Sequence, residues 1–254
     1  MENQTEHQAG QVNELMIEGR NAVLEAFRSG QPIDKVFLLD GCQDGPVRTI
    51  VREAKKYDTI LNFVTKERLD QMSETRKHQG VIAYAAAYEY AEIDDMFALA
   101  KEKGEDPFLI LLDNIEDPHN LGAIIRTANL AGAHGVIIPK RRAVGLTSTV
   151  AKTSAGALNY TPVAKVTNLA KTMEELKEKG MWFVCADMDG ESMYQLNLKG
   201  SIGLVIGSEG EGVGRLVKEK CDFIASIPMK GNIDSLNASV AAGILAYEIV
   251  RQRM

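Results

Sequence analysis

The chain has 254 residues, of which 45% are hydrophobic and 25% charged, with a formal net charge of −6 and a pI near 5.4. This composition is typical of an ordinary globular protein with one large core or two smaller ones, and the acidic balance counts against a protein that coats nucleic acid. No apolar run approaches the roughly 20 residues that a membrane span needs.

The start of the chain, MENQTEHQAGQVNE, is polar and acidic, unlike a signal peptide, and we expect residues 1–11 to form a flexible tail. The three cysteines, Cys42, Cys185 and Cys221, are far apart and lack CxxC spacing. Such cysteines favour buried thiols in a reducing cytoplasm over a disulfide framework or a metal site. The sequence therefore predicts a cytoplasmic protein without a bound metal.

Residues 12–90 are predicted to form a small α/β domain, because helical and strand patterns alternate along them. They contain no set of residues typical of a catalytic site. The expected elements are a helix over 21–28 closed by Gly30, a strand over 36–39, a helix over 47–56, a strand over 60–64, a helix over 66–72 and a strand over 80–87.

Residues 91–106 are rich in charge and show a helical pattern that stops at Gly104, which predicts a linker helix. Over residues 107–254 short apolar strands alternate with helices, which predicts a mainly parallel sheet covered on both faces. The expected elements are strands over 108–112, 135–138, 181–186, 204–206 and 223–227, with helices ending at Gly132, over 148–158, over 168–179 and after Ser235.

Polar and glycine-rich loops follow several of these strands. One loop over 207–214 contains four glycines, and a second over 228–237 leads to Ser235, a residue suited to cap the last helix. A third loop spans 113–122. Ligands of parallel sheets bind beyond the carboxyl ends of the strands, so we expect these loops to form a ligand site. Ordinary strand-to-helix turns would produce the same pattern.

The motifs of the common nucleotide-binding folds are absent. No GxGxxG follows a first strand, and no GxxxxGK[ST] or GxSxG occurs, which disfavours a dinucleotide dehydrogenase, a P-loop NTPase and an α/β-hydrolase. Of the four histidines only His119 lies in a candidate loop, where its expected role is local hydrogen bonding.

Three ordered stretches resemble the motifs of the SpoU (TrmH) family of SPOUT RNA 2′-O-ribose methyltransferases. They are EDPHNLGAIIRTANLAGAHGV from Glu116, LVIGSEGEGVGRLV from Leu204 and SIPMKGNIDSLNASVAAG from Ser226. The most similar group is that of the 23S rRNA (guanosine-2′-O-)-methyltransferases. The resemblance implies an α/β fold with a C-terminal SPOUT α/β-knot, which is a mainly parallel sheet with a trefoil knot. The N-terminal part, with its IEGRNAV stretch, is similar to the family's smaller L30e-like substrate-binding domain.

By this resemblance the methyl donor is S-adenosylmethionine. The family pattern places the cofactor against the backbone near Gly207, Ile227 and Leu236. These positions lie at or beside the loops over 207–214 and 228–237. Plain core packing is the alternative for Ile227 and Leu236, and both roles are compatible because only backbone groups would contact the ligand.

Five polar residues match the catalytic positions of the family, namely Asn120, Arg126, Glu209, Ser235 and Asn237. Arg126 is the family's proposed general base, but arginine normally stays protonated, so a clamp on an RNA phosphate is equally consistent with the sequence. Asn120 is expected to position Arg126 or the ribose, or else to cap its helix. Glu209 would orient substrate or backbone, and Ser235 and Asn237 would contact ribose or cofactor or simply start the last helix.

The resemblance also implies a homodimer in which one subunit's arginine meets the other's cofactor. Candidate RNA contacts are Arg20, Lys140, Arg141 and Arg142. The expected substrate is structured RNA, with a guanosine of 23S rRNA as the first choice. The alternatives are a tRNA 2′-O-methyltransferase and a non-catalytic RNA-binding protein with this fold.

Overall fold

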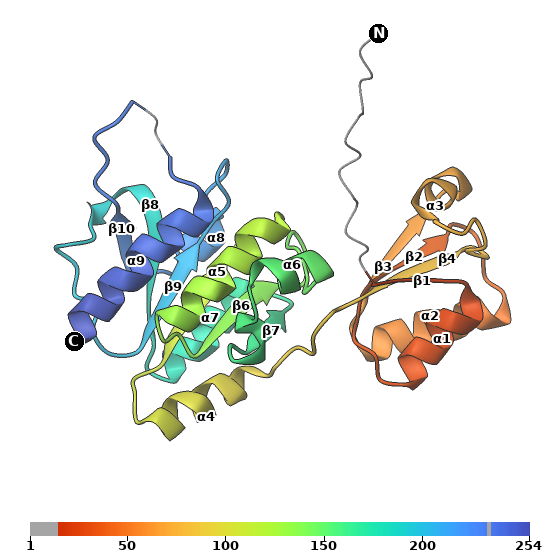
Figure 1. Ribbon diagram of the computed structural model, residues 1–254, viewed down its shortest axis with the longest axis horizontal. Helices are drawn as coiled ribbons and strands as arrows, with labels where there is room; N and C mark the ends of the chain where they lie inside the picture. The colour runs from red at the N-terminus through yellow and green to blue at the C-terminus, as the bar shows by residue number, and fades with distance from the viewer. Residues whose placement is uncertain (1–14, 233–234) are drawn as a thin grey trace, which may run out of the picture. The chain divides into compact units, whose positions relative to one another are not determined.

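The computed structural model describes residues 15–232 and 235–254 (Figure 1). Contacts within the chain divide it into two units, one ending at Ala86 and the other beginning at Ala87. The predicted tail over residues 1–11 lies outside the described residues.

The first unit is a four-stranded sheet with helices. Its strand order is β1-β4-β2-β3, in which only the β2–β3 pair is parallel. The apolar face of α1, which includes Val23 and Phe27, packs with Ile50 of α2 against Val36 and Leu38 of the sheet. The elements are β1 (Leu15–Glu18), α1 (Arg20–Arg28), β2 (Ile33–Leu39), α2 (Gly45–Lys56), β3 (Ile60–Val64), α3 (Lys66–Met72) and β4 (Val81–Ala85).

The second unit is built on a six-stranded sheet in which every pair of neighbours is parallel, in the order β10-β8-β9-β5-β6-β7. Its helices are α4 (Ile93–Lys103), α5 (Pro118–Leu130), α6 (Ser148–Thr153), α7 (Leu169–Glu178), α8 (Arg215–Lys218) and α9 (Ala238–Arg253), with a 3-10 turn η1 (Ala157–Asn159). Its strands are β5 (Phe108–Leu112), β6 (Gly135–Pro139), β7 (Val163–Val166), β8 (Trp182–Ser192), β9 (Ile202–Ile206) and β10 (Phe223–Ser226).

Helices cover both faces of this sheet. All five residues of β5 are buried, as expected for a central strand of a parallel sheet with two apolar faces. On one face Leu109 and Leu111 pack with Met96 of α4, Met173 of α7 and Val217 of α8. On the other face α5 and α9 lie side by side and contact the sheet (Figure 1). The start of α5 and the start of α9 are thereby brought close to the loop that follows β9.

The predicted α/β class with a mainly parallel sheet is confirmed, but three local predictions are wrong. The strands Leu15–Glu18 and Val163–Val166 were not expected, since each has only four residues. The helix expected over 148–158 ends at Thr153, because Ala155 and Gly156 adopt positive φ and break it before η1. The cap of α9 is Asn237 and not Ser235.

Among the described residues, no helix combines the length and the apolar character required to cross a bilayer. The trefoil knot implied by the resemblance and the domain bounds expected from the sequence patterns stay predictions.

Candidate active site

Three side chains from distant parts of the second unit meet beyond the carboxyl end of β9. The Glu209 carboxylate accepts a hydrogen bond from Asn120 Nδ2 on α5 at 3.1 Å, and another from Asn237 Nδ2. Asn237 also donates to Asn120 Oδ1 at 2.9 Å, and the Ala238 backbone N–H reaches Glu209 at 3.4 Å. The sequence-predicted residues Asn120, Glu209 and Asn237 therefore form one hydrogen-bonded cluster, which we call the Asn–Glu–Asn cluster.

The position of Asn237 in this cluster follows from its role as the helix cap. Its side-chain Oδ1 accepts hydrogen bonds from the backbone of Ser239 at 2.9 Å and of Val240 at 3.3 Å, which satisfies the first free N–H groups of α9. Asn120 does not cap its own helix, since Asp117 takes that role by accepting from the His119 backbone at 2.9 Å. The capping alternative for Asn120 is therefore wrong.

The loop after β9 is folded tightly back on itself. A Cβ atom on Gly207 would lie 2.0 Å from the backbone of Gly212, so only glycine fits at this position. The far end of the loop is fixed by Asp113, a largely buried residue directly after β5, whose Oδ2 accepts from the Gly214 backbone at 2.8 Å. Sequence reasoning missed Asp113, although its place at the end of a buried strand is a usable signal.

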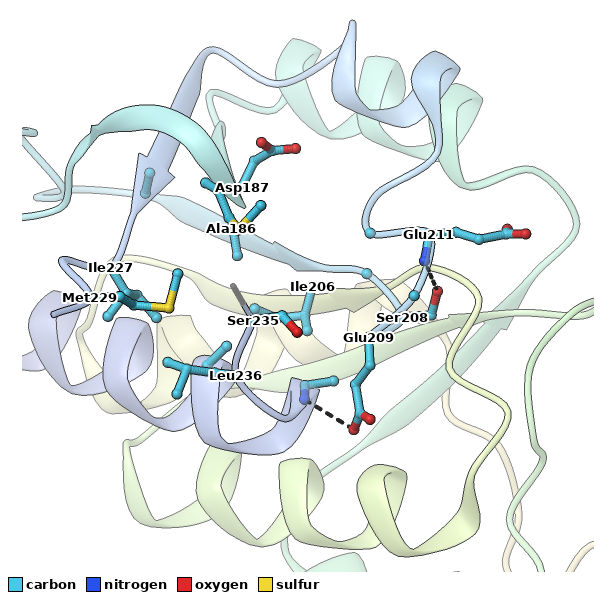
Figure 2. Close-up of a pocket in the computed structure, with 17 residues that line it drawn as sticks. Ala186, Asp187, Ile206, Ser208, Glu209, Glu211, Ile227, Met229, Ser235 and Leu236 are labelled. Atoms are coloured by element: carbon cyan, nitrogen blue, oxygen red, sulfur yellow. Dashed lines mark hydrogen bonds between the residues drawn. The ribbon is translucent and has the colours of Figure 1, made fainter. Parts of the chain in front are cut away.

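This loop forms one wall of a cavity of about 270 Å³ (Figure 2). Gly207, Ile227 and Leu236, which the family resemblance assigns to the cofactor, all line the cavity, and Ser235 does so too. In Figure 2 Leu236 and Asp187 lie on opposite walls. The lining is mostly apolar, with backbone groups of the Gly207 loop exposed to it, as in sites that hold a heterocycle.

Asp187 is a cavity residue that the sequence interpretation did not identify. It directly follows the predicted strand over 181–186, and its carboxylate pairs with Lys218 Nζ at 2.6 Å. Burial alone would raise the pKa of Asp187, but the hydrogen bonds from Lys218 and from the Asp189 backbone outweigh it and hold the pKa below its ordinary value. The same hydrogen bond raises the pKa of Lys218. The ion pair therefore joins the middle of β8 to α8 at the wall of the cavity.

A second cavity, of about 650 Å³, lies next to the first and shares Ser208, Glu209 and Glu211 with it. Its remaining polar lining includes Asn120, from the Asn–Glu–Asn cluster, and Arg142. Four carboxylates line it against a single guanidinium, the acidic residues being Glu116, Asp117, Glu209 and Glu211. A phosphate would be repelled from such a lining, whereas a neutral ribose or base with hydrogen-bond donors is compatible with it.

Arg126 is not part of either cavity. It is exposed on α5, six residues after Asn120, which places it roughly 120° around the helix from that residue. Its guanidinium has no hydrogen bond or ion pair with another described residue. The single chain therefore brings Asn120, Glu209 and Asn237 together, but not Arg126.

The four candidate RNA contacts differ in their surroundings. Arg141 and Arg142 are exposed after β6, and Arg142 reaches the second cavity, while Lys140 is half-buried and already has a partner. Arg20 forms an ion pair with Asp44 at 2.6 Å in the first unit. Among the described residues, no group of three or more His, Cys, Asp or Glu side chains is arranged to hold a metal ion.

Comparison with known proteins gives two family matches. The SpoU rRNA Methylase family matches residues 107–247, and the family described as RNA 2′-O ribose methyltransferase substrate binding matches residues 16–91. YacO of Bacillus subtilis (strain 168), placed in the TrmH family of tRNA/rRNA methyltransferases, is 53% identical over 237 residues, covering 92% of this chain and 94% of its own.

Two solved structures show the range of the structural likeness. The AdoMet-bound rRNA methyltransferase from Sinorhizobium meliloti is 21% identical with a TM-score of 0.57, and the match covers 94% of this chain and 88% of that one. The A. aeolicus TrmH/SpoU tRNA modifying enzyme is 27% identical with a TM-score of 0.53, but the match covers only 58% of this chain and 76% of that one.

Proposed function

The chain belongs to the SpoU rRNA methylase family, and we propose that it transfers a methyl group from S-adenosylmethionine to a ribose 2′-hydroxyl of structured RNA in the cytoplasm. The observation that carries the proposal is the pair of adjacent cavities with a common wall of Ser208, Glu209 and Glu211. One cavity suits the methyl donor and the other the acceptor nucleoside, so the two reacting groups would meet at that wall.

The residues of the smaller cavity fit the cofactor. Its apolar side chains, among them Ile227 and Leu236, offer packing surfaces for the adenine ring, and the backbone of the Gly207 loop offers hydrogen-bonding groups at close approach. When bound, S-adenosylmethionine supplies an electrophilic methyl group on a sulfonium. The carboxylates of Glu209 and Glu211 give this wall a negative potential that favours a cationic donor.

The Asn–Glu–Asn cluster acts by positioning. The Glu209 carboxylate already accepts hydrogen bonds from Asn120, Asn237 and the Ala238 backbone, so it has little capacity left to remove a proton. We assign it the task of fixing the start of α5 and of α9 against the Gly207 loop. The amide of Asn120, which lines the acceptor cavity, then orients the ribose.

Arg126 would complete the site of a second copy in a homodimer. It is exposed and free of internal partners, and α9 next to its helix exposes Val240 and Tyr247, which are 47% and 50% accessible. Loss of the hydroxyl proton leaves negative charge on the 2′-oxygen, and a guanidinium stabilises such charge either directly or through the neighbouring phosphate. We therefore propose that the partner's cavity pair receives this arginine.

The extent of the structural matches supports rRNA as the substrate class. The Sinorhizobium meliloti protein named an rRNA methyltransferase matches 94% of this chain, whereas the A. aeolicus tRNA modifying enzyme matches only 58%. We propose a guanosine of 23S rRNA as the target, with a tRNA ribose as the second candidate. The filled polar positions of the Asn–Glu–Asn cluster weigh against a non-catalytic RNA-binding protein.

The test is transfer of tritium from labelled S-adenosylmethionine to unmodified 23S rRNA transcript and, separately, to bulk tRNA. Alkali-resistant label in rRNA alone supports the proposal, and label in tRNA alone shifts the substrate to the second candidate. Bound RNA and bound cofactor without transfer to either RNA or to ribosomal assembly intermediates would overturn the proposed activity.

A further inference from the structure

The loop between α3 and β4, residues 73–80, presents two cations that the candidate active site does not use. Arg76 and Lys77 are both exposed at its tip. Neither side chain has a hydrogen bond or an ion pair with another residue that the structure describes. Because no carboxylate of the described residues neutralises them, Arg76 and Lys77 form a local concentration of positive charge on the first unit, which carries carboxylates elsewhere.

The loop is organised by a carboxylate rather than left to move freely. Glu18, at the end of β1, accepts hydrogen bonds from Ser73 Oγ at 2.7 Å and Thr75 Oγ1 at 2.6 Å. It also accepts from the backbone of Glu74 at 2.8 Å and of Thr75 at 3.3 Å. Four donors from three successive residues thus converge on one side chain that lies 55 residues earlier in the chain.

The same hydroxyl groups fix the two cationic residues. Ser73 Oγ accepts from the Arg76 backbone at 2.8 Å, and Thr75 Oγ1 accepts from the Lys77 backbone at 3.2 Å. Arg76 has a φ of 56°, a conformation that L residues adopt only where their surroundings impose it. The loop is closed by His78, whose Nδ1 accepts from the Gly80 backbone at 3.0 Å. The backbone that carries the two cations is therefore ordered before any ligand binds, while their charged groups stay exposed.

The start of α1 lies against this loop. Arg20 Nε donates to the Gln79 carbonyl at 3.0 Å, while its Nη1 pairs with Asp44. The N-cap of α1 is Gly19, which makes no side-chain cap. The first backbone N–H groups of α1 therefore have no side-chain capping oxygen, and the helix dipole adds positive potential at this end of the helix.

We propose that the 73–80 loop, with Arg76 and Lys77, is a preorganised contact for the phosphate backbone of the RNA substrate, and that Glu18 is its positioning residue. The inference rests on the proposed function, because it takes RNA as the partner. A loop whose backbone is already ordered binds phosphates with less loss of backbone entropy than a flexible loop, and each phosphate neutralised releases counterions.

The basic residues of α2 provide a matched control. Arg48 and Lys55 are exposed on this helix of the same unit, so removing them changes the net charge by the same amount as removing Arg76 and Lys77. They lie on a regular helix and form no hydrogen bond or ion pair with the described residues of the 73–80 loop. A bulk charge effect would be equal for the two pairs, whereas a specific contact would not.

The experiment compares full-length wild type, Arg76→Gln/Lys77→Gln and Arg48→Gln/Lys55→Gln in binding to unmodified 23S rRNA transcript over a range of salt concentrations. We expect the loop variant to bind about tenfold more weakly and to reduce the slope of log K against log salt by about 2, while the α2 variant stays close to wild type. Equal losses in both variants, or none in the loop variant, would overturn the inference.

Glu18→Ala tests whether Glu18 positions the loop, because the two explanations predict opposite changes in RNA affinity. Removing a carboxylate from an RNA-binding surface should strengthen binding if only net charge matters. We expect weaker binding instead, because the loop loses its anchor. Glu25→Ala, which removes an exposed carboxylate of α1 outside the loop, should leave binding unchanged or slightly tighter. Tighter binding by Glu18→Ala would show that the loop needs no organiser.

The outcomes separate this inference from the proposed function. Binding of S-adenosylmethionine, followed by calorimetry, reports on the second unit and should be the same in all variants. If the wild-type protein methylates RNA, and the loop variant binds and methylates it equally well, only the loop contact is refuted. A wild-type protein that binds no RNA refutes the proposed function itself.

Discussion

The side-chain amide of Asn237 donates a hydrogen bond to that of Asn120, 117 residues earlier in the chain, at 2.9 Å. This contact joins the cap of the last helix to the first turn of α5, and Glu209 accepts from both amides. Its functional importance can be tested at the shared acceptor.

Glu209→Gln should lower the rate of methyl transfer by about 10- to 100-fold. The new amide replaces one acceptor oxygen by an N–H donor, at a position where two side-chain amides and a backbone N–H now donate hydrogen bonds. The folded protein should remain, since the cluster is exposed. Transfer rates and calorimetric affinity for S-adenosylmethionine, measured together, separate positioning from cofactor binding. Glu219→Gln, at the exposed residue that directly follows α8, is the control. Equal rates in the two variants would remove Glu209 from the site.

Gly207→Ala should prevent the loop after β9 from folding as described, because the added Cβ would meet the Gly212 backbone. We expect a lower melting temperature and at least tenfold weaker binding of S-adenosylmethionine. Gly210→Ala, in the same loop, adds a Cβ with no atom within 4 Å and should keep the wild-type melting temperature. Equal melting curves for both variants would contradict the tight fold of this loop.

Asp113→Ala should destabilise the second unit by about 1–3 kcal/mol, because the Gly214 N–H loses its acceptor in a largely buried position. Asp113→Asn retains a side-chain oxygen and should recover part of the loss. Urea denaturation of the three proteins checks this order. An alanine variant as stable as wild type would mean that the loop finds another acceptor.

The Asp187–Lys218 pair predicts a specific pH dependence. Because the pKa of Asp187 in the folded protein lies below its ordinary value of 3.8, its contribution to stability is complete above that value and is lost as the pH falls through the folded-state pKa. Asp187→Asn should therefore be less stable than wild type at about pH 6, and the difference should shrink towards about pH 3. A difference that is constant with pH would exclude the ion pair as its cause.

Mixing two inactive variants tests whether Arg126 acts on a partner subunit. In a mixed dimer of Arg126→Ala and Glu209→Gln, one site would combine an intact Asn–Glu–Asn cluster with an intact arginine from the other chain. Random reassociation should then restore about a quarter of the wild-type activity, since half of the dimers are mixed and each has one such site. No recovery, with dimers shown by sedimentation, would place Arg126 in the site of its own chain.

The sequence predicted the sheet of the second unit because its strands are short, apolar and separated by helices. It also identified Asn120, Glu209 and Asn237, through motif resemblance. The sequence could not show that these residues are in contact, since Glu209 and Asn237 come close to Asn120 only because of the order of the strands in the folded sheet. Ser235 looked like the cap because serine is a common N-cap, but Asn237 is the residue whose Oδ1 reaches the first N–H groups of α9. Asp113, directly after β5, and Asp187, within β8, were missed because single carboxylates carry no periodic signal.

The place of β5 in the sheet affects how the protein is made. β5 pairs with β6 soon after both are synthesised, but its other neighbour, β9, joins through pairs such as Leu109 with Gly203. While the ribosome synthesises the intervening segment, a fully apolar strand keeps one edge open, which is the kind of edge that other chains can pair with. This edge of β5 stays open until β9 emerges, and the cap of α9 is synthesised later still. The Asn–Glu–Asn cluster is thus complete only after the segment that carries Asn237 has been synthesised.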